Sequence, residues 1–525
     1  TIALVTLLSV YVYGGQVTGK VTDSQTGEPL VGCNILVKGT FEGTTSLNGG
    51  SYSLEANPGD VLVVSYIGYV TQEIPVEEGA TSINISLETD VLRQEGVAVV
   101  GSRFTPRTVI TSPVPIDNLS IRDLKSTGQV SVEAMMTNKL PSYNSQQQTI
   151  SDATAHFDPA DLRGLGPSRT LVLVNGKRKN ASALVYINDT PGKGEVGVDM
   201  KSIPAAAIER IEVLRDGASA QYGSDAIAGV INIILKDDVD YTTVNFRAGT
   251  TTEGDGFNQG FDASTGIRVG SNGFLNLSAS FHDQEETYRA GEPGGDGLFG
   301  VVFGSDAILN GTDPWLVDNP DMGMHVGMPN MTTNDVSYNF GYNLDGKNKF
   351  YSFGSLTTRK SLSYALYRAP YWIPDANYIF HDSTETYEGF QPTFESDVID
   401  NNFTAGVTGD KSGWNYDLSA SFGSNAVDYK VDNSQNLDMG AESPTTFNPG
   451  GYEFSHSVTN FDLSKSLGMI TLGLGSEFRF ENFVALAGEE ASYYGGGVQS
   501  FPGIQPQNAV DVNRQNFGFY VDLGA

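Results

Sequence analysis

The most regular pattern in the chain is a strict alternation of apolar and polar residues in its second half. Over 275–282, four apolar residues at odd positions alternate with four polar residues at even positions. The same period of two recurs over 414–422, 470–480 and 517–523. Successive side chains of a strand point to opposite faces, so this pattern predicts many antiparallel strands with one apolar and one polar face.

A different pattern fills Ile208 to Lys236. Apolar Ile211 and Val213 alternate with charged neighbours, which predicts a strand that Asp216-Gly217 ends. Gly217 is a residue that tolerates a positive φ. One helical turn over 218–221 and a glycine hinge follow, and the β-branched run 230–235 predicts a second, buried strand.

Upstream, cap and turn residues divide 113–207 into short elements. Ser120-Ile-Arg-Asp123 resembles a capping box, and Gly128 is placed to end the helix that it starts. Ser131 predicts the N-cap of a second helix, which runs through Lys139. The run 171–174 predicts a strand followed by a tight Asn175-Gly176 turn.

Five short strand-like runs occupy residues 16–88, separated by turn signals such as Thr26-Gly-Glu-Pro29 and Asn57-Pro-Gly-Asp60. This pattern predicts a small β-sandwich. Gly19-Lys-Val-Thr-Asp23 and Tyr66-Ile-Gly-Tyr69 resemble the carboxypeptidase-regulatory-like domain, a non-catalytic accessory. The chain's one cysteine, Cys33, lies in a strand context and is expected to be a small buried apolar residue.

The order of elements over 113–238, and above all the segment Ile208 to Lys236, resembles the plug domain of TonB-dependent outer-membrane receptors. The resemblance implies a mostly β chain: an N-terminal β-sandwich (16–88), an α+β plug (113–238) and part of a transmembrane antiparallel β-barrel (239–525). A soluble sandwich or propeller would alternate similarly, but the upstream plug favours the barrel.

The length left for the barrel is short. About 285 residues follow Asp240, and a spanning strand takes roughly 9–11 residues plus its loops. We therefore expect ten to twelve strands, where the resembled barrel has about twenty-two. This predicts an open, half-formed wall and a sequence truncated at both ends.

The stretch 89–112 is expected to be a linker. Its Val97, Ala98, Val99 and Val100 resemble the TonB box, which binds the energy-transducing partner by adding a strand. The alternatives are the last strand of the sandwich or the first strand of the plug. Residues 1–15 are almost wholly apolar up to Tyr13, which is typical of a partial signal peptide; a buried strand is the alternative.

Charge and chemistry narrow the function classes. The net charge of −31 argues against a nucleic-acid partner, since phosphate binding needs a basic face. The acidity is typical of solvated loops, although loops that hold divalent cations are an alternative. The five histidines have no ligand spacing and no catalytic motif is present, so we expect no enzyme activity, no metal site and no cofactor.

The polar loop after the second predicted helix is the candidate ligand-binding site. It offers Tyr143, Gln146, Gln147, Asp152 and His156, an aromatic and polar set suited to ligand contact. A merely solvated loop is the alternative. The loop from Asn180 to Gly197 is a second candidate.

The resemblance implies TonB-dependent import of a scarce nutrient, most simply of the iron-siderophore type, across a Gram-negative outer membrane. The plug and N-terminal domain would face the periplasm. The implied partners are a TonB-type energy-transducing protein, outer-membrane lipid and an extracellular small ligand. An importer of oligosaccharides or peptides that works with a surface lipoprotein is the alternative. A non-transporting surface protein for adhesion or signalling is the second alternative.

Overall fold

The computed structural model describes residues 15–24, 27–40, 42–66, 69, 71–88, 97–98, 107–108, 116–145, 153–186, 192–291, 314–370, 373, 379–380, 387–468 and 470–524. The chain divides into two compact units: residues 1–98 with 107–111, and residues 99–106 with 112–525. Within the described ranges, no helix is both long and apolar enough to cross a membrane.

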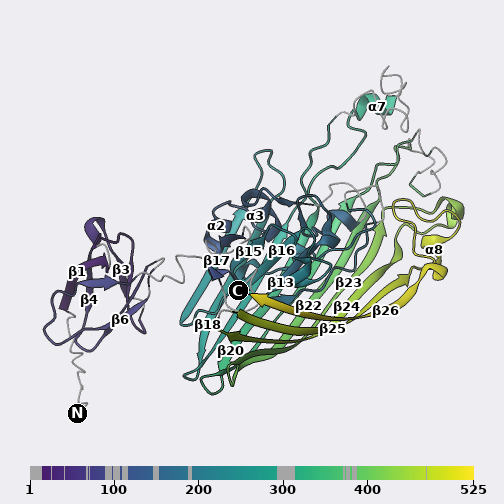
Figure 1. Ribbon diagram of the computed structural model, residues 1–525. Coiled ribbons are helices and arrows are strands. Elements are labelled where there is room, and N and C mark those ends of the chain that lie inside the picture. Colours follow the sequence, from purple (N-terminus) through teal and green to yellow (C-terminus); the bar gives the residue numbers. More distant parts are fainter. Residues whose placement is uncertain are drawn as a thin grey trace, which may run out of the picture. The chain divides into compact units, whose positions relative to one another are not determined.

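The N-terminal unit holds two small sheets (Figure 1). Their strand orders are β4-β1-β7 and β3-β2-β5-β6. The strands are β1 (Gly15–Asp23), β2 (Asn34–Val37), β3 (Gly43–Thr45), β4 (Ser51–Ala56), β5 (Val61–Ser65), β6 (Gln72–Pro75) and β7 (Ile85–Leu87). Alternate residues such as Ile35, Leu62 and Val64 are fully buried, and Cys33 is buried with them as expected. Residues 1–14 of the predicted signal-like stretch lie outside the described residues.

The second unit contains an inner domain, defined here as residues 116–235, built on a mixed five-stranded sheet of order β10-β15-β16-β13-β14. Strands β13 and β16 run parallel, and the other neighbours are antiparallel. Its strands and main helices are β10 (Ile116–Ser120), α2 (Ile121–Lys125), α3 (Val132–Lys139), β11 (Tyr143–Asn144), β12 (Asp161–Leu162), β13 (Thr170–Val174), β14 (Lys177–Arg178), β15 (Ile208–Leu214), α4 (Ser219–Tyr222) and β16 (Gly229–Leu235).

Local sequence signals explain most of these boundaries. The Ser120 hydroxyl accepts from the Asp123 amide at 3.2 Å and caps α2, as the capping-box pattern predicts. Ser131 precedes α3, but its side chain makes no capping bond. Asn175 and Gly176 both have positive φ, 46° and 77°, which is the two-residue hairpin turn expected between β13 and β14.

The segment from β15 to β16 has the predicted strand, helical-turn, strand order. Positive φ angles in this segment occur at Gly223 (91°) and Gly229 (152°). At Gly229 a Cβ atom would lie 2.3 Å from the Leu214 carbonyl oxygen. The glycine therefore permits both the backbone conformation and the close approach of β15 to β16.

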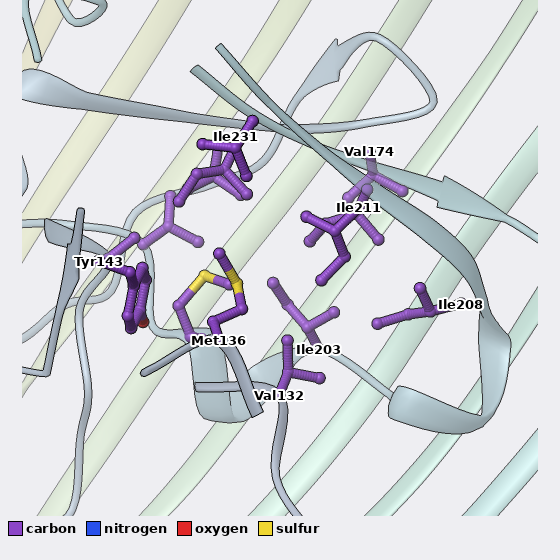
Figure 2. Close-up of a cluster of buried hydrophobic side chains, with 14 of the residues drawn as sticks. Val132, Met136, Tyr143, Val174, Ile203, Ile208, Ile211 and Ile231 are labelled. Carbon is purple, nitrogen blue, oxygen red and sulfur yellow. The ribbon is translucent and has the colours of Figure 1, made fainter. Parts of the chain in front are cut away.

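The inner domain has its own apolar core. Figure 2 shows Val132 and Met136 of α3 facing Ile211 of β15 and Ile231 of β16, with Tyr143 beside them and the long strands of the wall passing behind. All five side chains are at most 3% exposed. Burial of this order contributes roughly 1.5–3 kcal/mol for each large apolar side chain, so the core suffices to hold helices and sheet together.

Ten antiparallel strands form the wall, each bonded to its neighbour in sequence. They are β17 (Tyr241–Gly249), β18 (Asn258–Val269), β19 (Gly273–Gln284), β20 (Asn330–Asn343), β21 (Asn348–Tyr364), β22 (Thr393–Lys411), β23 (Trp414–Asp432), β24 (Phe447–Leu467), β25 (Ile470–Ala487) and β26 (Val510–Gly524). Among the described residues, β17 and β26 do not pair with each other, so the sheet is open. The inner domain lies against one face of it (Figure 1).

The two faces of the wall differ as the alternation predicts. On β19, Leu277 is 41% exposed and its neighbour Asn276 is 6% exposed. The same parity gives exposed apolar residues on one face of the other strands, including Phe246, Phe261, Val336, Leu356, Phe403, Leu418, Phe461, Phe478 and Phe519. The polar face is directed toward the inner domain. An apolar outer face with a polar inner face is the pattern of a transmembrane barrel wall.

The wall strands are longer than expected. Strands β20 to β26 are 14–21 residues long, more than the roughly 9–11 residues of a simple span. Strand β22 continues to Lys411, and Ser412 and Gly413, with φ of 58° and 76°, form the turn to β23.

Candidate functional site: the seam between inner domain and wall

The predicted TonB box lies at the edge of the described residues. Val97 and Ala98 form the two-residue strand β8, which pairs antiparallel with β9 (Arg107–Thr108). Val99 and Val100 lie outside the described residues. Binding of a partner strand to this stretch therefore stays a prediction.

The predicted ligand loop is only partly described, because Gln146, Gln147 and Asp152 lie outside the described residues. Tyr143 is 3% exposed and belongs to the core of the inner domain. Its hydroxyl is buried and has no hydrogen-bond partner among the described residues. A ligand contact by Tyr143 stays a prediction, and in this conformation it would require the loop to open.

His156 lies between the inner domain and the wall. Its ring is fully buried, with Nδ1 2.7 Å from the Ser396 hydroxyl of β22 and Nε2 3.0 Å from the Ser363 hydroxyl of β21. Burial, reinforced by the nearby positive charges of Arg359 and Lys201, lowers the pKa of His156 to about 3. The ring is therefore neutral, and it ties the inner domain to two wall strands.

The boundary between the inner domain and the inward face of the wall, here called the seam, carries a fully buried ion pair. Arg359 of β21 donates from Nη2 to Oδ2 of Asp199 at 2.6 Å, and the two side chains are 0% and 1% exposed. The amides of Asp158 and Lys201 donate to the other carboxylate oxygen, each at 3.2 Å. Burial alone would raise the pKa of Asp199, but Arg359 and these donors hold that pKa below its ordinary value.

A second buried pair joins Lys179 of the inner domain to Asp400 of β22, each 2% exposed. Asp400 also accepts from Asn180 at 2.9 Å and from Asn425 of β23 at 3.0 Å. Asn425 in turn accepts from the Ala183 amide at 2.8 Å. These bonds satisfy both partners of the pair, which is the condition under which a buried ion pair is tolerated.

A third ionic contact sits beside α4. Asp225, from the segment between β15 and β16, accepts from Arg178 of β14 and from Arg479 of β25, the latter at 3.1 Å. Burial alone would raise the pKa of Asp225, but the two guanidinium groups hold that pKa below its ordinary value. One carboxylate therefore bridges a strand of the inner domain and a strand of the wall.

A cleft of about 490 Å³ opens next to this contact. One side is formed by residues of the inner domain, including Arg178, Ser182 and Glu195. The other side is formed by Phe454, His456, Arg479, Glu481 and Phe483 of β24 and β25 and by Arg514 of β26.

The chemistry of the seam is that of attachment. In the described part of the chain, no group of three or more His, Cys, Asp or Glu side chains is arranged to hold a metal ion. The ionic and hydrogen-bonded contacts come from short loops and strand ends of the inner domain, and an apolar cluster also joins Phe157 and Tyr186 of that domain to Phe394 and Tyr429 of the wall. Because the polar bonds are directional, they can hold the domain in one position.

Sequence reasoning missed Lys179, Asp199, Asp225 and Arg359. One signal was available for Arg359: in β21 it has the opposite parity to the outward Leu356, so it belongs to the inward face. No comparable periodicity marks Asp199 or Lys179, because both lie in irregular backbone.

Comparisons with known proteins agree on two domains. Residues 108–230 match the family described as the TonB-dependent receptor plug domain, and residues 17–99 match the CarboxypepD_reg-like domain. The TonB-dependent receptor SusC of Bacteroides thetaiotaomicron is 31% identical over 239 residues, 44% of this chain and 22% of that protein. The ferric enterobactin receptor PirA of Pseudomonas aeruginosa is 33% identical over 151 residues, 28% of this chain and 20% of that protein.

Among solved structures, the ferric enterobactin receptor PfeA of Pseudomonas aeruginosa, in a complex with enterobactin, has a TM-score of 0.52 at 14% identity. The similarity covers 78% of this chain and 55% of that chain, and it shows the shared fold of plug and wall. The present chain thus spans about half of this structural relative and about a fifth of the curated ones. The inner domain is therefore a plug domain of the TonB-dependent receptor type, here called the plug.

Proposed function

We propose that the protein imports a scarce nutrient across the outer membrane, with the plug as a gate that a TonB-type partner opens. The observation that carries this proposal is the seam. The plug is attached to the inward face of the wall by buried ion pairs and by an apolar cluster to which both contribute, while most of the plug's own core lies within the plug. A gate requires a domain with a core of its own, because it must stay assembled when its contacts to the wall are exchanged.

In this mechanism the plug and the N-terminal unit face the periplasm. The ligand binds at the extracellular side, and the box around Val97 then becomes available in the periplasm. A partner strand then pairs with the box, and the pull remodels the plug. Hydrogen bonds of a small sheet contribute only about 0.5–1.5 kcal/mol net each. Sequential opening from the edge strand β10, which pairs with β15 over five residues, is therefore energetically accessible.

The test uses the full-length receptor in cells. Deleting residues 97–100 should abolish energised uptake and leave surface binding of the ligand unchanged. A finer test compares uptake by the Val99→Pro and Val99→Ala variants. Proline removes the backbone N–H that strand pairing needs, while alanine keeps it. Uptake that persists in the deletion and in the proline variant would exclude a TonB-box role for this stretch. It would also favour a non-transporting adhesion or signalling protein.

For the cargo we propose an iron-siderophore type of ligand, supported by relatives that are named siderophore and ferric enterobactin receptors. Import of an oligosaccharide or peptide together with a surface lipoprotein is the second candidate. It is favoured by the match to SusC, which extends over 239 residues. Uptake of a panel of ferric siderophores and labelled oligosaccharides by cells with and without the receptor decides between the two.

A further inference from the structure

Methionine is concentrated in one short segment that leads into β20. Four of the chain's nine methionines lie within ten residues, and a histidine lies among them. The segment 322–331, here called the methionine segment, contains Met322, Met324, His325, Met328 and Met331. An even distribution of nine methionines over 525 residues would place less than one in any ten residues. Such a concentration of sulfur in a loop calls for a cause.

Packing in an apolar core does not supply that cause. Methionine often fills gaps between apolar side chains. Met331 is buried, but its direct partners across the strands are Gln284 of β19 and Ser361 of β21, which are both polar. Met324 and Met328 are only half-buried, and a glycine precedes each of them. The segment therefore lacks the surroundings in which methionine serves as a gap filler.

The backbone of the methionine segment turns sharply at its start. Met322 and Gly323 have φ of 60° and 63°, and the Met324 amide donates to the Asp321 carbonyl oxygen at 3.3 Å. Positive φ at both central residues is the signature of the tight type I′ turn. Glycine, asparagine and aspartate tolerate such angles best, so the turn itself does not explain a methionine at position 322.

His325 is held by two aromatic rings, while its nitrogens are uncommitted. The centre of its ring lies 4.3 Å from that of Tyr364 at the end of β21 and 5.2 Å from that of Tyr288. Among the residues that the structure describes, neither ring nitrogen of His325 makes a hydrogen bond. An imidazole that is fixed in position and has a free nitrogen is suited to bind a metal ion.

The donors of the methionine segment favour a soft metal ion. Thioether sulfur selects copper(I), and imidazole nitrogen also suits copper. Zinc is held by Cys, His and carboxylate ligands, and in the described part of the chain no group of three or more of those side chains is arranged for it. No lysine or arginine occurs between Arg289 and Lys347, so this part of the chain presents no positive charge to an incoming cation.

We propose that the methionine segment binds copper(I) through the thioethers of Met324 and Met328 and a ring nitrogen of His325. Met322 and Met331 are further thioether donors within the same ten residues. Each methionine side chain has three rotatable bonds, so its sulfur can turn toward the fixed histidine ring. The histidine spacing that predicted no metal site does not report on thioether donors. The site is independent of the proposed import, because neither candidate cargo is a free metal ion.

The experiment measures copper(I) binding to the purified full-length receptor in detergent, without oxygen, by competition with the chromogenic chelator bicinchoninate. We expect the receptor to remove copper(I) from the chelator. The double variant Met324→Leu and Met328→Leu should bind copper(I) at least about tenfold more weakly, because leucine keeps the apolar volume but has no sulfur. His325→Phe keeps a ring beside Tyr288 and Tyr364 and should weaken binding at least about fivefold.

The matched control is Met439→Leu. Met439 lies between β23 and β24, is also half-buried and has no histidine within ten residues, so its replacement should leave the affinity for copper(I) unchanged. Excess zinc(II) should not displace the bound copper(I).

Three results would overturn the proposal. One is a wild-type receptor that removes no copper(I) from the chelator, and another is displacement of copper(I) by zinc(II). The third is equal copper(I) affinity in the double variant and the Met439→Leu control at matching melting temperatures. If the double variant does not fold, Met328→Leu alone and His325→Phe decide. The assay contains no TonB partner, so its failure is distinguishable from a failure of energised uptake in cells.

Discussion

Arg359 of the wall and Asp199 of the plug form an ion pair from which water is excluded, with 2.6 Å between Nη2 and Oδ2. The Arg359 guanidinium also lies 5.0 Å from the centre of the Phe157 ring, while its Nε and Nη1 have no hydrogen-bond partner in the part of the chain that the structure describes. The arginine therefore depends on one carboxylate and one aromatic face for compensation. A group in that position is costly to bury when it loses its partner.

Removing one member of this pair should loosen the plug. We expect Arg359→Met to cost about 3–5 kcal/mol, because it leaves the Asp199 carboxylate buried and uncompensated. Hydrogen exchange over 153–203 in the purified receptor measures the loss. The double variant with Asp199→Asn should recover most of the protection, since no charge is then left unpaired. Lys360→Met is the control: it changes the next residue of the same strand, which is 80% exposed, and should have little effect. Equal exchange in the Arg359 and Lys360 variants would refute the attachment.

Acid should weaken the seam through His156. The pKa of this ring falls from an ordinary 6.5 to about 3 because the ring is buried next to Arg359 and Lys201. Between those two pH values the unfolded chain binds a proton that the native state does not. Stability is therefore fully present above pH 6.5 and is lost as the pH falls toward 3. The shift corresponds to about 5 kcal/mol over the full range.

Plug unfolding measured at pH 7.5 and pH 5 checks this expectation. His156→Gln keeps hydrogen-bonding capacity toward Ser363 and Ser396 but does not titrate, so its stability should depend less on pH than that of the wild type. His325→Gln changes a histidine outside the seam and serves as the control. A His156→Gln protein with the pH dependence of the wild type would show that other groups govern acid sensitivity.

Periodicity predicted the architecture well, because it reports which face of a strand is buried. The alternation around Leu277 gave the two faces of the wall, and the β-branched run of β16 gave the central strand of the plug sheet. Both signals are local and repeat over many residues, so tertiary packing does not override them. The strand lengths were underestimated because nothing in the sequence marks where a strand leaves the membrane.

The site was predicted less well, for a physical reason. Polar residues in a loop have the same local pattern whether they meet solvent, a ligand or another part of the chain. Tyr143 and His156 were selected as polar loop residues, yet the structure buries both. The burial of His156 depends on its contacts with Ser363 and Ser396, which lie on strands more than two hundred residues away along the chain. A single sequence carries no information about such long-range pairs.

Gly229 should be intolerant of any side chain. Its φ is 152°, and a Cβ atom added to it would lie 2.3 Å from the Leu214 oxygen, so β15 and β16 would have to move apart. We expect Gly229→Ala to destabilise the plug by at least about 1–3 kcal/mol and to increase its cleavage by a protease added to the purified receptor. Gly518→Ala is the control, because nothing lies within 4 Å of its Cβ position. Equal cleavage of the two variants would show that the strand pair accommodates the methyl group.

The outward face of the wall should reject charge as a membrane-facing surface does. Leu418 of β23 is 51% exposed, and Leu47 of the N-terminal unit is 66% exposed. In water both positions would accept arginine at little cost. If the wall faces lipid, Leu418→Arg should cost up to about 2–4 kcal/mol, depending on its depth in the bilayer, whereas Leu47→Arg should remain neutral. Refolding of the full-length receptor into lipid vesicles, followed by urea titration, measures both values. If Leu418→Arg left the free energy of unfolding in vesicles unchanged, this part of the face would contact water. Exposure alone does not distinguish the two leucines, so the difference between the variants reports only the solvent around each one.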